Sequence, residues 1–526
     1  MYQVGARRKP RYNRAAIMQE RGKVSSICAE CGAPVTFEVG AVQVSCSHCD
    51  AGLAVDRGTR LVRLGCPRCG GNFYYIDGSL CGHCPYCDAS LLALAEDRVL
   101  RYVVRPEAEP PAEAEGARLL LLPFWHLGGL LYAWQLGKKV EYVEDRPSSS
   151  GEAQDTGDIV GKIRKDSGPQ KVWAGRVLDQ SLPDPATSAY GVTSLRTRAA
   201  VFPLEPFSRE HEQLGQVVPA CLDHRKSRGK LFAHAMRLAA AAEGLTQVDC
   251  QRFDLVSDAL ALYYYPFWVK NNDGGGYDVW DAVSGQPEQV STPVDPPEAS
   301  ASGIFDELSL VELNCAACGG ALPAGNHSTV IPCPGCGRFW QVTRQGLAPF
   351  EAFYARPRTA AQGTPVWLPF WRINVQVGYS GKRAACVADL TNVLGMLKVP
   401  GDKPRAAPDS PLCYYVPAFG AMKAPRVDHA ARDLTRYQPA IEAGELGRGE
   451  LYTCFLGEDD ARKLAYATWI LVVQVTAVSR IRSLRIETGA ASLWYVPFDQ
   501  DRGGRELINL LTGVSYDRVA FRGVRH

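Results

Sequence analysis

One cysteine spacing occurs three times in this chain and constrains its fold more than any other feature. Each copy reads C-x2-C-x14-C-x2-C, so twelve of the 18 cysteines fall into three matched quartets. The spacing suits a four-thiolate tetrahedral metal site, because each C-x2-C pair forms a tight turn and the fourteen residues between pairs can form a short hairpin. The predicted ligands are Cys28, Cys31, Cys46 and Cys49; Cys66, Cys69, Cys84 and Cys87; and Cys315, Cys318, Cys333 and Cys336.

The equal spacing also separates these ligands from nearby cysteine and histidine residues. In register, Cys81 aligns with Gln43 and Val330, neither of which supplies a thiolate. Cys81 is therefore predicted to be a strand residue. His83 and His48 are not needed to complete a site, because each quartet already holds four sulfurs.

Zinc is the expected ion, at three per chain, because it is the default metal of a four-sulfur tetrahedron. Iron, used for one-electron transfer, suits the same shell and stays an alternative. Disulfides are disfavoured, since the basic N-terminus is not followed by the apolar segment of a secretory signal. Thioredoxin-type redox pairs are disfavoured because the pairs come as quartets. A closed four-cysteine shell has no open position, so its expected role is to stabilise structure.

Three knuckle phrases carry a resemblance to a known superfamily. They are Cys66-Pro67-Arg68-Cys69-Gly70, Cys84-Pro85-Tyr86-Cys87 and Cys333-Pro334-Gly335-Cys336-Gly337. These resemble the Cys-Pro-x-Cys-Gly knuckles of the zinc-ribbon, or rubredoxin-like, superfamily. The resemblance covers three short modules, and it implies a fold and a metal rather than an activity.

A second repeat lies outside the cysteine quartets. Each half of the chain has a ribbon, a Pro-Phe-Trp phrase, a looser proline phrase and a last phrase, and this order predicts a tandem duplication with one additional ribbon at the front. Because proline lacks an N–H, each is predicted at a strand edge or bulge, with its aromatic neighbours in the core. The phrases are Pro123-Phe124-Trp125, Pro266-Phe267-Trp268, Pro369-Phe370-Trp371 and Pro497-Phe498-Asp499, and the looser ones are Pro203/Pro206-Phe207 and Pro417-Ala418-Phe419.

The expected fold class is α+β and strand-rich, with three small zinc ribbons, two related β-rich domains and few helices. Helices are expected at 229–243 and 428–437. The segments 119–136 and 464–479 are expected to be buried strand, the first with a hairpin turn at Gly128-Gly129 and the second because 468–478 is rich in β-branched residues. The predicted units are a basic arm at 1–24, ribbons at 25–62 and 63–104, an acidic linker at 105–117, a β-rich domain at 118–286, a linker at 287–308, a ribbon at 309–350 and a β-rich domain at 351–526.

Charge argues against a protein that coats nucleic acid. The formal net charge is +2, and seven of the basic residues lie in residues 1–24. Bound zinc would make the chain more negative, because each Zn(Cys)4 unit is formally −2. Nucleic-acid binding through the basic arm Arg7–Lys23 stays an alternative, and it predicts an affinity that falls steeply with salt.

No catalytic constellation is apparent, so we do not expect an enzyme. The chain has no His-Glu-x-x-His and no Gly-x-Ser-x-Gly motif. Cys221 has histidines near it in the sequence, but their spacing does not indicate a catalytic Cys–His pair. These histidines are His211, His224 and His234.

The preferred hypothesis is a cytoplasmic zinc-ribbon scaffold that binds a protein partner or complex. No transmembrane segment is expected, since 119–136 and 464–479 fall short of the ~20 residues that a span requires. Peripheral membrane contact by Leu119–Leu136 stays an alternative.

Overall fold

The computed structural model describes most of the chain, with gaps. The described residues are 23–27, 34–38, 43–45, 47, 52–54, 60–94, 99–138, 140–144, 162–166, 170–195, 204–242, 247–290, 292, 308–325, 327–379, 381–392, 405–419, 427–447, 449–465, 469, 484–500 and 506–517. Strand accounts for 48% of the structure and helix for 14%, so the expected strand-rich α+β character is confirmed. Within these residues, no helix has the length and apolar character needed to cross a membrane.

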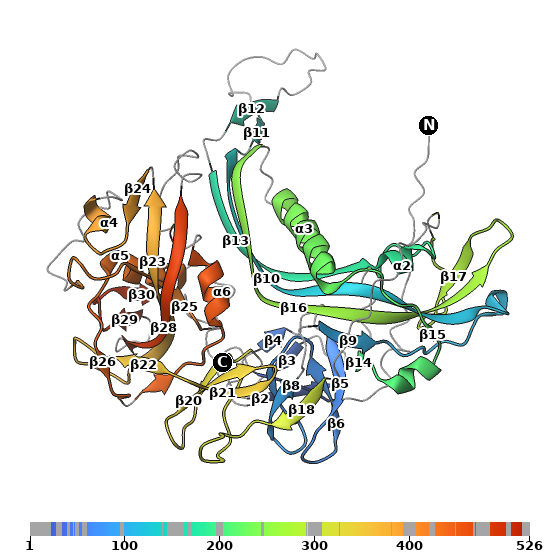
Figure 1. The fold of residues 1–526 in the computed structure, drawn as a ribbon, viewed down its shortest axis with the longest axis horizontal. Helices are drawn as coiled ribbons and strands as arrows, with labels where there is room; N and C mark the ends of the chain where they lie inside the picture. The colour runs from blue at the N-terminus through green and yellow to red at the C-terminus, as the bar shows by residue number, and fades with distance from the viewer. Residues whose placement is uncertain are drawn as a thin grey trace, which may run out of the picture.

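A seven-stranded sheet forms the core of the first half (Figure 1). Its order is β13-β10-β16-β9-β14, with β15 paired to β10 and β17 paired to β16. The strands are β9 (Val99–Val103), β10 (Arg118–Lys138), β13 (Gln170–Pro183), β14 (Glu205–Pro206), β15 (Gln216–Val217), β16 (Gln247–Asn271) and β17 (Tyr277–Asp281). Helices α2 (Pro185–Ser188) and α3 (His224–Ala242) and 3-10 turns at Ala112–Ala114 and Arg209–Gln213 accompany the sheet.

The first half of β10 is apolar at nearly every position because both of its faces are buried. Leu120 and Leu122 pack toward the second ribbon, in a core cluster that includes Cys66 and Cys84. Leu121 packs on the opposite face, in the cluster that includes residues of α3. A central strand covered on both sides reads as a continuous apolar run, and this accounts for the uncharged segment at 119–136.

A nine-stranded sheet forms the second half. Its order is β24-β23-β28-β22-β26, with β25 and β27 paired to β23 and the β29–β30 hairpin paired to β28. The strands are β22 (Ala352–Ala355), β23 (Val366–Tyr379), β24 (Lys382–Ala384), β25 (Cys413–Pro417), β26 (Ala443–Gly444), β27 (Glu450–Leu451), β28 (Arg485–Gln500), β29 (Glu506–Asn509) and β30 (Ser515–Asp517). The helices are α4 (Asp389–Asn392), α5 (Val427–Tyr437) and α6 (Glu458–Lys463). Helices α3 and α5 confirm the two helices expected from the sequence.

Small sheets make up the rest of the described structure. A four-stranded sheet has the order β2-β1-β6-β5, a three-stranded sheet has the order β18-β8-β7, and another has the order β19-β20-β21; β3 pairs with β4, and β11 with β12. The strands are β1 (Lys23–Ile27), β2 (Pro34–Glu38), β3 (Gln43–Ser45), β4 (Gly52–Ala54), β5 (Leu61–Gly65), β6 (Asn72–Ile76), β7 (Cys81–His83), β8 (Ser90–Leu94), β11 (Val140–Glu144), β12 (Lys162–Asp166), β18 (Ser309–Glu312), β19 (Val330–Pro332), β20 (Phe339–Thr343) and β21 (Gly346–Phe350).

Around their prolines, the two large sheets pair in the same register. The matching pairs are Pro123–Tyr264 with Pro369–Tyr495, Phe124–Pro183 with Phe370–Pro417, Leu120–Gln216 with Val366–Glu450, and Phe267–Asp281 with Phe498–Asn509. Pro417 therefore corresponds to Pro183. The expected match of Pro417 with the phrase at Pro203/Pro206-Phe207 is wrong, because strand pairing rather than sequence likeness decides which prolines are equivalent.

The prolines of the four main phrases all lie inside central strands. Each stands where one strand on the neighbouring side ends and the next begins. These prolines are Pro123, Pro266, Pro369 and Pro497. On one side of β23, β27 pairs up to Trp367 and β25 pairs from Phe370 onward, so Pro369 falls in the gap between them. Each proline carbonyl accepts a backbone N–H at 2.9–3.1 Å, given by Asp184 to Pro123, Ala282 to Pro266, Ala418 to Pro369 and Leu510 to Pro497. The prediction of edge or bulge positions is therefore corrected: the missing N–H falls at an interruption of the ladder, where proline is tolerated.

The predicted hairpin turn at Gly128-Gly129 is wrong, because β10 runs through both residues. A β-bulge lies here, opposite the break between Val256 and Ala259 of β16. A Cβ on Gly129 would lie 3.1 Å from the Cα of Asp258 and from the carbonyl oxygen of Val256, and its φ is +146°. The bulge accompanies the strong curvature of β10, β13 and β16 in Figure 1. Within the predicted strand at 464–479 the structure describes Leu464, which lies in a turn, and Ala465 and Trp469, which are helical and buried. The strand prediction is therefore wrong at these residues, and the rest of the segment lies outside the described residues.

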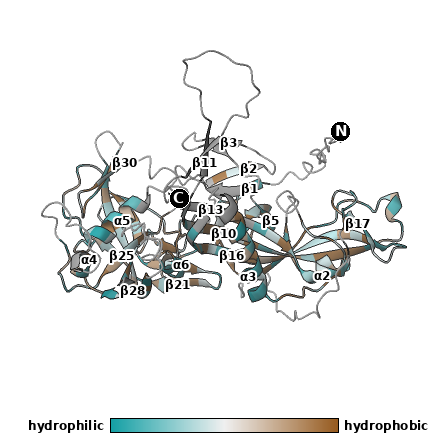
Figure 2. Cartoon of the chain, turned by 90° about the horizontal axis from the view of Figure 1, so that it is seen from above, coloured by the Kyte–Doolittle hydropathy of each residue, from teal (hydrophilic) through white to brown (hydrophobic). Residues whose placement is uncertain are grey.

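The extended end of the first sheet packs against the second half. Leu130, Trp134 and Val256 share one core cluster with Trp371 and Trp469. In Figure 2, hydrophobic colour follows the strands that lead to β17, and the outer turn of that hairpin is hydrophilic. The long strands thus join the two halves through apolar burial, which is the main favourable term in such contacts.

Candidate metal centres

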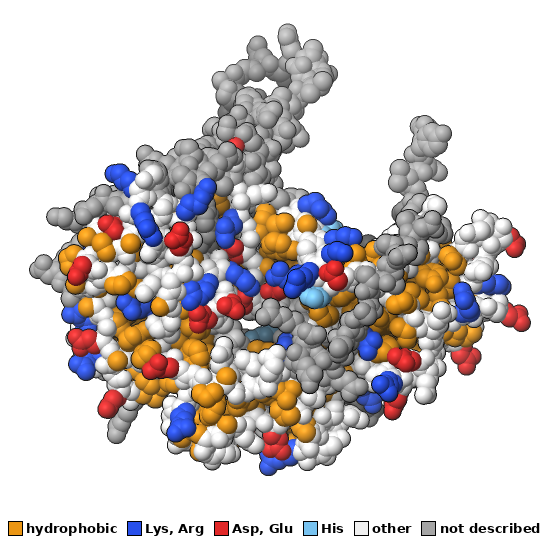
Figure 3. Space-filling view, viewed as in Figure 1, with side chains coloured by type: hydrophobic (Ala, Val, Ile, Leu, Met, Phe, Trp, Pro, Cys, Tyr) orange, Lys and Arg blue, Asp and Glu red, His pale blue; other side chains and the backbone are white. Residues whose placement is uncertain are grey.

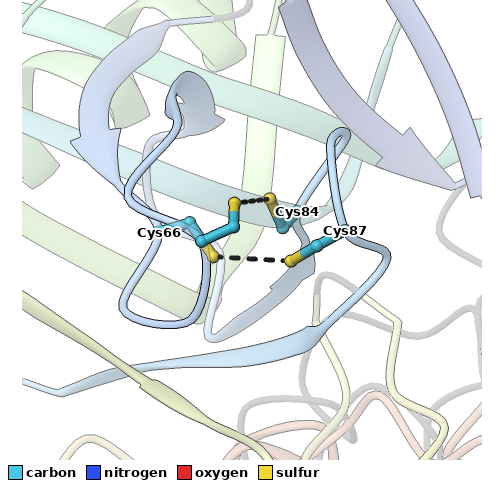
Figure 4. A group of neighbouring side chains, drawn as sticks. Cys66, Cys84 and Cys87 are labelled. Atoms are coloured by element: carbon cyan, nitrogen blue, oxygen red, sulfur yellow. Dashed lines mark hydrogen bonds between the residues drawn. The ribbon is translucent and has the colours of Figure 1, made fainter.

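The second cysteine quartet brings four sulfurs together beside the first large sheet. Cys66 and Cys69 follow β5, and Cys84 and Cys87 lie between β7 and β8. The Sγ atoms of Cys66 and Cys87 are 3.8 Å apart, and those of Cys69 and Cys84 are 3.7 Å apart. Figure 4 shows Cys66, Cys84 and Cys87 turned toward one another.

The third quartet has the same arrangement. The Sγ atoms of Cys315 and Cys336 are 3.6 Å apart, and those of Cys318 and Cys333 are 3.5 Å apart. In each quartet all four sulfurs lie within 4.8 Å of one another. A tetrahedron with Zn–S bonds of ~2.3 Å has S–S edges of about 3.8 Å, so both quartets fit a single ion with four sulfur ligands.

Both turns of each quartet have the same backbone form, and this explains the residue after each C-x2-C pair. The N–H of that residue donates to the carbonyl of the first cysteine of the pair at 2.8–2.9 Å. Its φ is positive, and the residues are Gly70 (73°), Asp88 (56°), Gly319 (73°) and Gly337 (72°). Glycine adopts this left-handed conformation without steric cost, and aspartate tolerates it better than most residues do.

Backbone amides and burial act in opposite directions on the thiols. The N–H of Gly71 lowers the pKa of Cys69. Burial raises the pKa of Cys315, but the N–H groups of Ala317 and Cys318 outweigh it and lower the pKa to about 6. Burial raises the pKa of Cys84 to about 12. Because a metal binds thiolates, ion binding at either quartet releases protons and is weaker at low pH.

An indole N–H supports the third quartet and has no counterpart in the second. Nε1 of Trp340 donates to Sγ of Cys315 at 3.2 Å, and Trp340 is buried. Leu91 occupies the equivalent position after Cys87. Hydrogen bonds to a ligating sulfur orient it and tune the site. Sequence reasoning missed this contact, and the only signal was an aromatic residue four positions after Cys336.

The modules predicted to be the second and third ribbons form one unit. Strand β18 precedes the third quartet and pairs antiparallel with β8 of the second ribbon, from Ser309 opposite Leu94 to Glu312 opposite Leu91. Leu92 and Cys81 share a core cluster with Cys315 and Trp340. Two modules more than 200 residues apart in the chain are therefore joined by a sheet and a core.

The residues near the ligands also have defined places. Cys81 lies in β7 and is fully buried, as predicted for a strand residue. Burial raises the pKa of its thiol to about 12. A ring nitrogen of His83 lies 3.1 Å from the carbonyl oxygen of Ala324 in the third ribbon, so His83 is placed at the contact between ribbons.

The first quartet lies outside the described residues, as does His48. The structure therefore supports two metal sites, and the third site stays a prediction. Its four cysteines are Cys28, Cys31, Cys46 and Cys49.

Among the other described cysteines, Cys250 and Cys413 lie in β16 and β25, Cys386 and Cys454 form isolated β-bridges, and Cys221 lies in a bend before α3. Cys413 and Cys454 are fully buried, and Cys386 donates to a carboxylate oxygen of Asp389 at 3.2 Å. His211 contacts Ser208 through Nδ1 at 2.9 Å and Glu205 through Nε2 at 3.1 Å. His211 is buried, and both of its ring nitrogens have partners in this region, Ser208 on its own turn and Glu205 in β14. Compared with protein-family models, curated proteins and solved structures, the chain matches none of them.

Proposed function

We propose that this protein is a non-catalytic zinc-ribbon scaffold or adaptor that assembles a protein complex in the cytoplasm. The observation that carries the proposal is the closed four-sulfur geometry of the second and third quartets. An ion held by four cysteines has no position for substrate or water, so it supplies folding free energy rather than chemistry. Reduced thiols of this kind suit a cytoplasmic location.

Zinc is the proposed ion, at three per chain, and the first quartet is the proposed third site. The sulfur spacing alone suits iron as well as zinc. Metal analysis of the purified protein separates the two. We expect a colourless protein with three zinc ions per chain, whereas a coloured, iron-containing protein would favour electron transfer.

The proposed architecture is a tandem duplication of a ribbon followed by a β-rich domain. Four matching pairs of residues around the prolines support it, because their registers are the same in the two sheets. The docking of the second and third ribbons supports a rigid body that presents several surfaces. Such a body suits a scaffold, since a preorganised surface loses little entropy when it binds.

The visible charge distribution supports a protein partner over a nucleic acid. On the face drawn in Figure 3, Lys and Arg side chains are interspersed with Asp and Glu. Ion pairs such as Arg228 with Asp258, at 2.8 Å, join opposite charges on the described surface. A nucleic-acid surface would instead gather basic residues on one face.

Affinity capture of the full chain from its native cells tests the scaffold. We expect a protein partner at constant stoichiometry, retained after nuclease treatment. Repeated captures without such a partner, or a captured nucleic acid released by moderate salt, would contradict the proposal.

A matched pair of cysteine variants links the partner to the ribbons. Cys336→Ser removes a predicted ligand, so we expect it to lose one zinc ion and most of the partner. Cys386→Ser changes a cysteine outside the quartets. The serine hydroxyl can still donate a hydrogen bond to Asp389, as the thiol does. It is expected to retain three zinc ions and the partner.

A further inference from the structure

A cavity of about 440 Å³ lies where the second ribbon, the third ribbon and the two large sheets meet. The turn after β6 contributes Asp77, the bulge of β10 contributes Leu130 and β16 contributes Ala259. Arg344 directly follows β20, and Phe455 lies between β27 and α6. A recess near the centre of Figure 3 opens in this region, between the two halves. A largely apolar cavity with a few convergent polar groups is the usual form of a small-molecule site.

The bend of the first sheet shapes one wall of this cavity. Ser257 has a φ of +50°, which is uncommon for a residue with a side chain. Its N–H donates to a carboxylate oxygen of Asp460 at 2.8 Å, which joins the bend to α6. Backbone strain that is held in this way is concentrated at functional sites.

Two arginine side chains bring positive charge to the cavity. Arg60 is 9% exposed, with its guanidinium 4.9 Å from the centroid of the Tyr263 ring and its Nη2 3.3 Å from Oγ of Ser181. Nη1 of Arg344 is buried and has no hydrogen-bond partner among the residues that the structure describes. A buried guanidinium N–H without an acceptor is costly, and a bound anion would remove that cost.

The carboxylates that line the cavity already have partners. Asp77 accepts a hydrogen bond from the Tyr263 hydroxyl at 2.7 Å. Asp258 pairs with Arg228 at 2.8 Å and with Lys463 at 3.5 Å. Asp460 pairs with Lys463 at 2.6 Å, in addition to the N–H of Ser257. The charges of Asp258 and Asp460 are cancelled by Arg228 and Lys463. Asp77 cancels the charge of one of the two cavity arginines, so one positive charge remains.

His126 adds a neutral polar group beside Arg60. It is 4% exposed, its ring stacks on Tyr263 at 5.0 Å, and its Nδ1 lies 3.2 Å from Oγ of Ser181. Burial, together with the charge of Arg60, lowers the pKa of His126 well below its ordinary value. The imidazole therefore adds no positive charge to the cavity at physiological pH.

We infer that this cavity binds a small organic anion, with its acidic group at Arg344 and Arg60 and its apolar body against Leu80, Leu130 and Phe455. One net positive charge favours a ligand with a single negative charge. The apolar part of the lining favours a ligand with an apolar body over a small inorganic ion, because Leu80, Leu130 and Phe455 offer an ion no hydrogen bonds in return for its lost water. This site is separate from the metal centres and goes beyond the proposed scaffold role.

Two fluorescent probes test the inference on the zinc-loaded full chain. 8-Anilino-1-naphthalenesulfonate carries a sulfonate on an apolar ring system, and N-phenyl-1-naphthylamine has the same rings without the charge. We expect one saturable site for the sulfonate, with the neutral probe bound at least tenfold more weakly, because a charge-assisted contact is worth about a tenfold change in affinity.

Three substitutions locate that site. Arg344→Gln is expected to weaken binding of the sulfonate about tenfold and to leave the neutral probe within about twofold. Ala259→Phe fills the cavity and is expected to weaken both probes. Arg383→Gln changes an exposed arginine of β24 and is expected to change neither.

Zinc content and circular dichroism establish that each variant is folded. If Ala259→Phe does not fold, Leu178→Phe fills the same cavity from β13. Equal binding of the sulfonate by Arg344→Gln and the wild type would overturn the inference, as would unchanged binding of both probes after the cavity is filled.

Discussion

The two large sheets share one arrangement around their prolines and differ in what extends beyond it. Strands β10 and β16 have 21 and 25 residues, whereas β23 and β28 have 14 and 16. The first sheet therefore continues past its bulge, while the second ends soon after its own bulge near Ile373. Both sheets contain the shared part, and the extension of the first sheet contacts the second half.

This difference shows how one arrangement of paired strands can carry an additional surface while its shared register stays the same. The pairs around Pro123 and Pro369 stay in register, because a one-residue slip would turn every side chain to the opposite face. Beyond the bulge, Leu130 and Trp134 join a core cluster of the second half. The same bulge, at Gly129, lines the cavity.

The largest effect that we expect is the loss of a metal ion from one of the two predicted ribbons that precede the sheets. Cys84→Ser and Cys333→Ser each remove one predicted ligand from equivalent positions, and each is expected to lose one ion. Loss of a site removes an apparent ~10–16 kcal/mol of binding free energy that folds the ribbon. Native mass spectrometry measures the ions, and hydrogen exchange at 90–94 and 309–312 measures the local structure.

Because β18 pairs with β8, we expect either cysteine variant to lower the exchange protection of both strands. Cys386→Ser serves as the control and should keep the ion content and protection of the wild type. Protection that falls only in the substituted ribbon would show that the two ribbons fold independently.

A smaller effect tests whether the turns that close the two sheets are equivalent. Asp281 accepts the N–H groups of Val283 and Ser284 at 2.8 and 3.2 Å, and Asn509 accepts those of Leu511 and Thr512 at 2.9 and 3.2 Å. Asp281→Ala and Asn509→Ala leave two amides without this acceptor, so each should lower the free energy of unfolding by about 2–4 kcal/mol. Denaturant unfolding measures the change.

Asp281→Asn refines the same comparison, because asparagine makes this turn in the second sheet. The Tyr265 hydroxyl also reaches the Asp281 carboxylate at 3.3 Å, and Val496 stands at that position in the second sheet. We expect the free energy of unfolding to fall by about 1 kcal/mol, because the Tyr265 hydroxyl donates a weaker hydrogen bond to an amide than to a carboxylate. A loss as large as that of Asp281→Ala would break the equivalence of the two turns.

The smallest effect concerns pH and is expected only in the first sheet. Burial raises the pKa of Glu205, but hydrogen bonds from Arg105 and His211 outweigh it and lower the pKa below the ordinary 4.5. Since the pKa is lower in the folded state, Glu205 stabilises the fold above the unfolded-state pKa and loses that contribution as the pH falls through its folded-state value. Gly444 stands at the equivalent position in the second sheet.

Unfolding free energies of the wild type and Glu205→Gln, measured between about pH 3 and pH 7, test this effect. The two should converge at the acidic end and differ by ~1 kcal/mol at neutral pH, a modest value because Arg105 is largely exposed. Parallel pH profiles would show that Glu205 makes no such contribution.

Features that depend on short-range spacing could be predicted from the chain alone. The second and third quartets were identified from cysteine spacing, and the structure brings each set of sulfurs together. Helices α3 and α5 follow from local residue patterns. These predictions succeed because a knuckle or a helix is decided by residues only a few positions apart.

Features that depend on distant pairing could not be predicted. Trp340 donates to the sulfur of Cys315 only because β20 folds back on the third quartet. Gly128-Gly129 has a local pattern typical of a turn, but pairing with β16 on one side and β13 on the other keeps the strand continuous through a bulge. Tertiary contacts override weak local preferences where many ladder bonds act together.

The sequence by itself determined which cysteines can share an ion and which phrases repeat, since both are written as regular spacing. The tertiary structure alone decided that Pro183 is the counterpart of Pro417, that β18 joins two ribbons, and that Arg60 and Arg344 line one cavity. The physical reason is that these relations join residues far apart in the chain, and only the packing of the whole core brings them together.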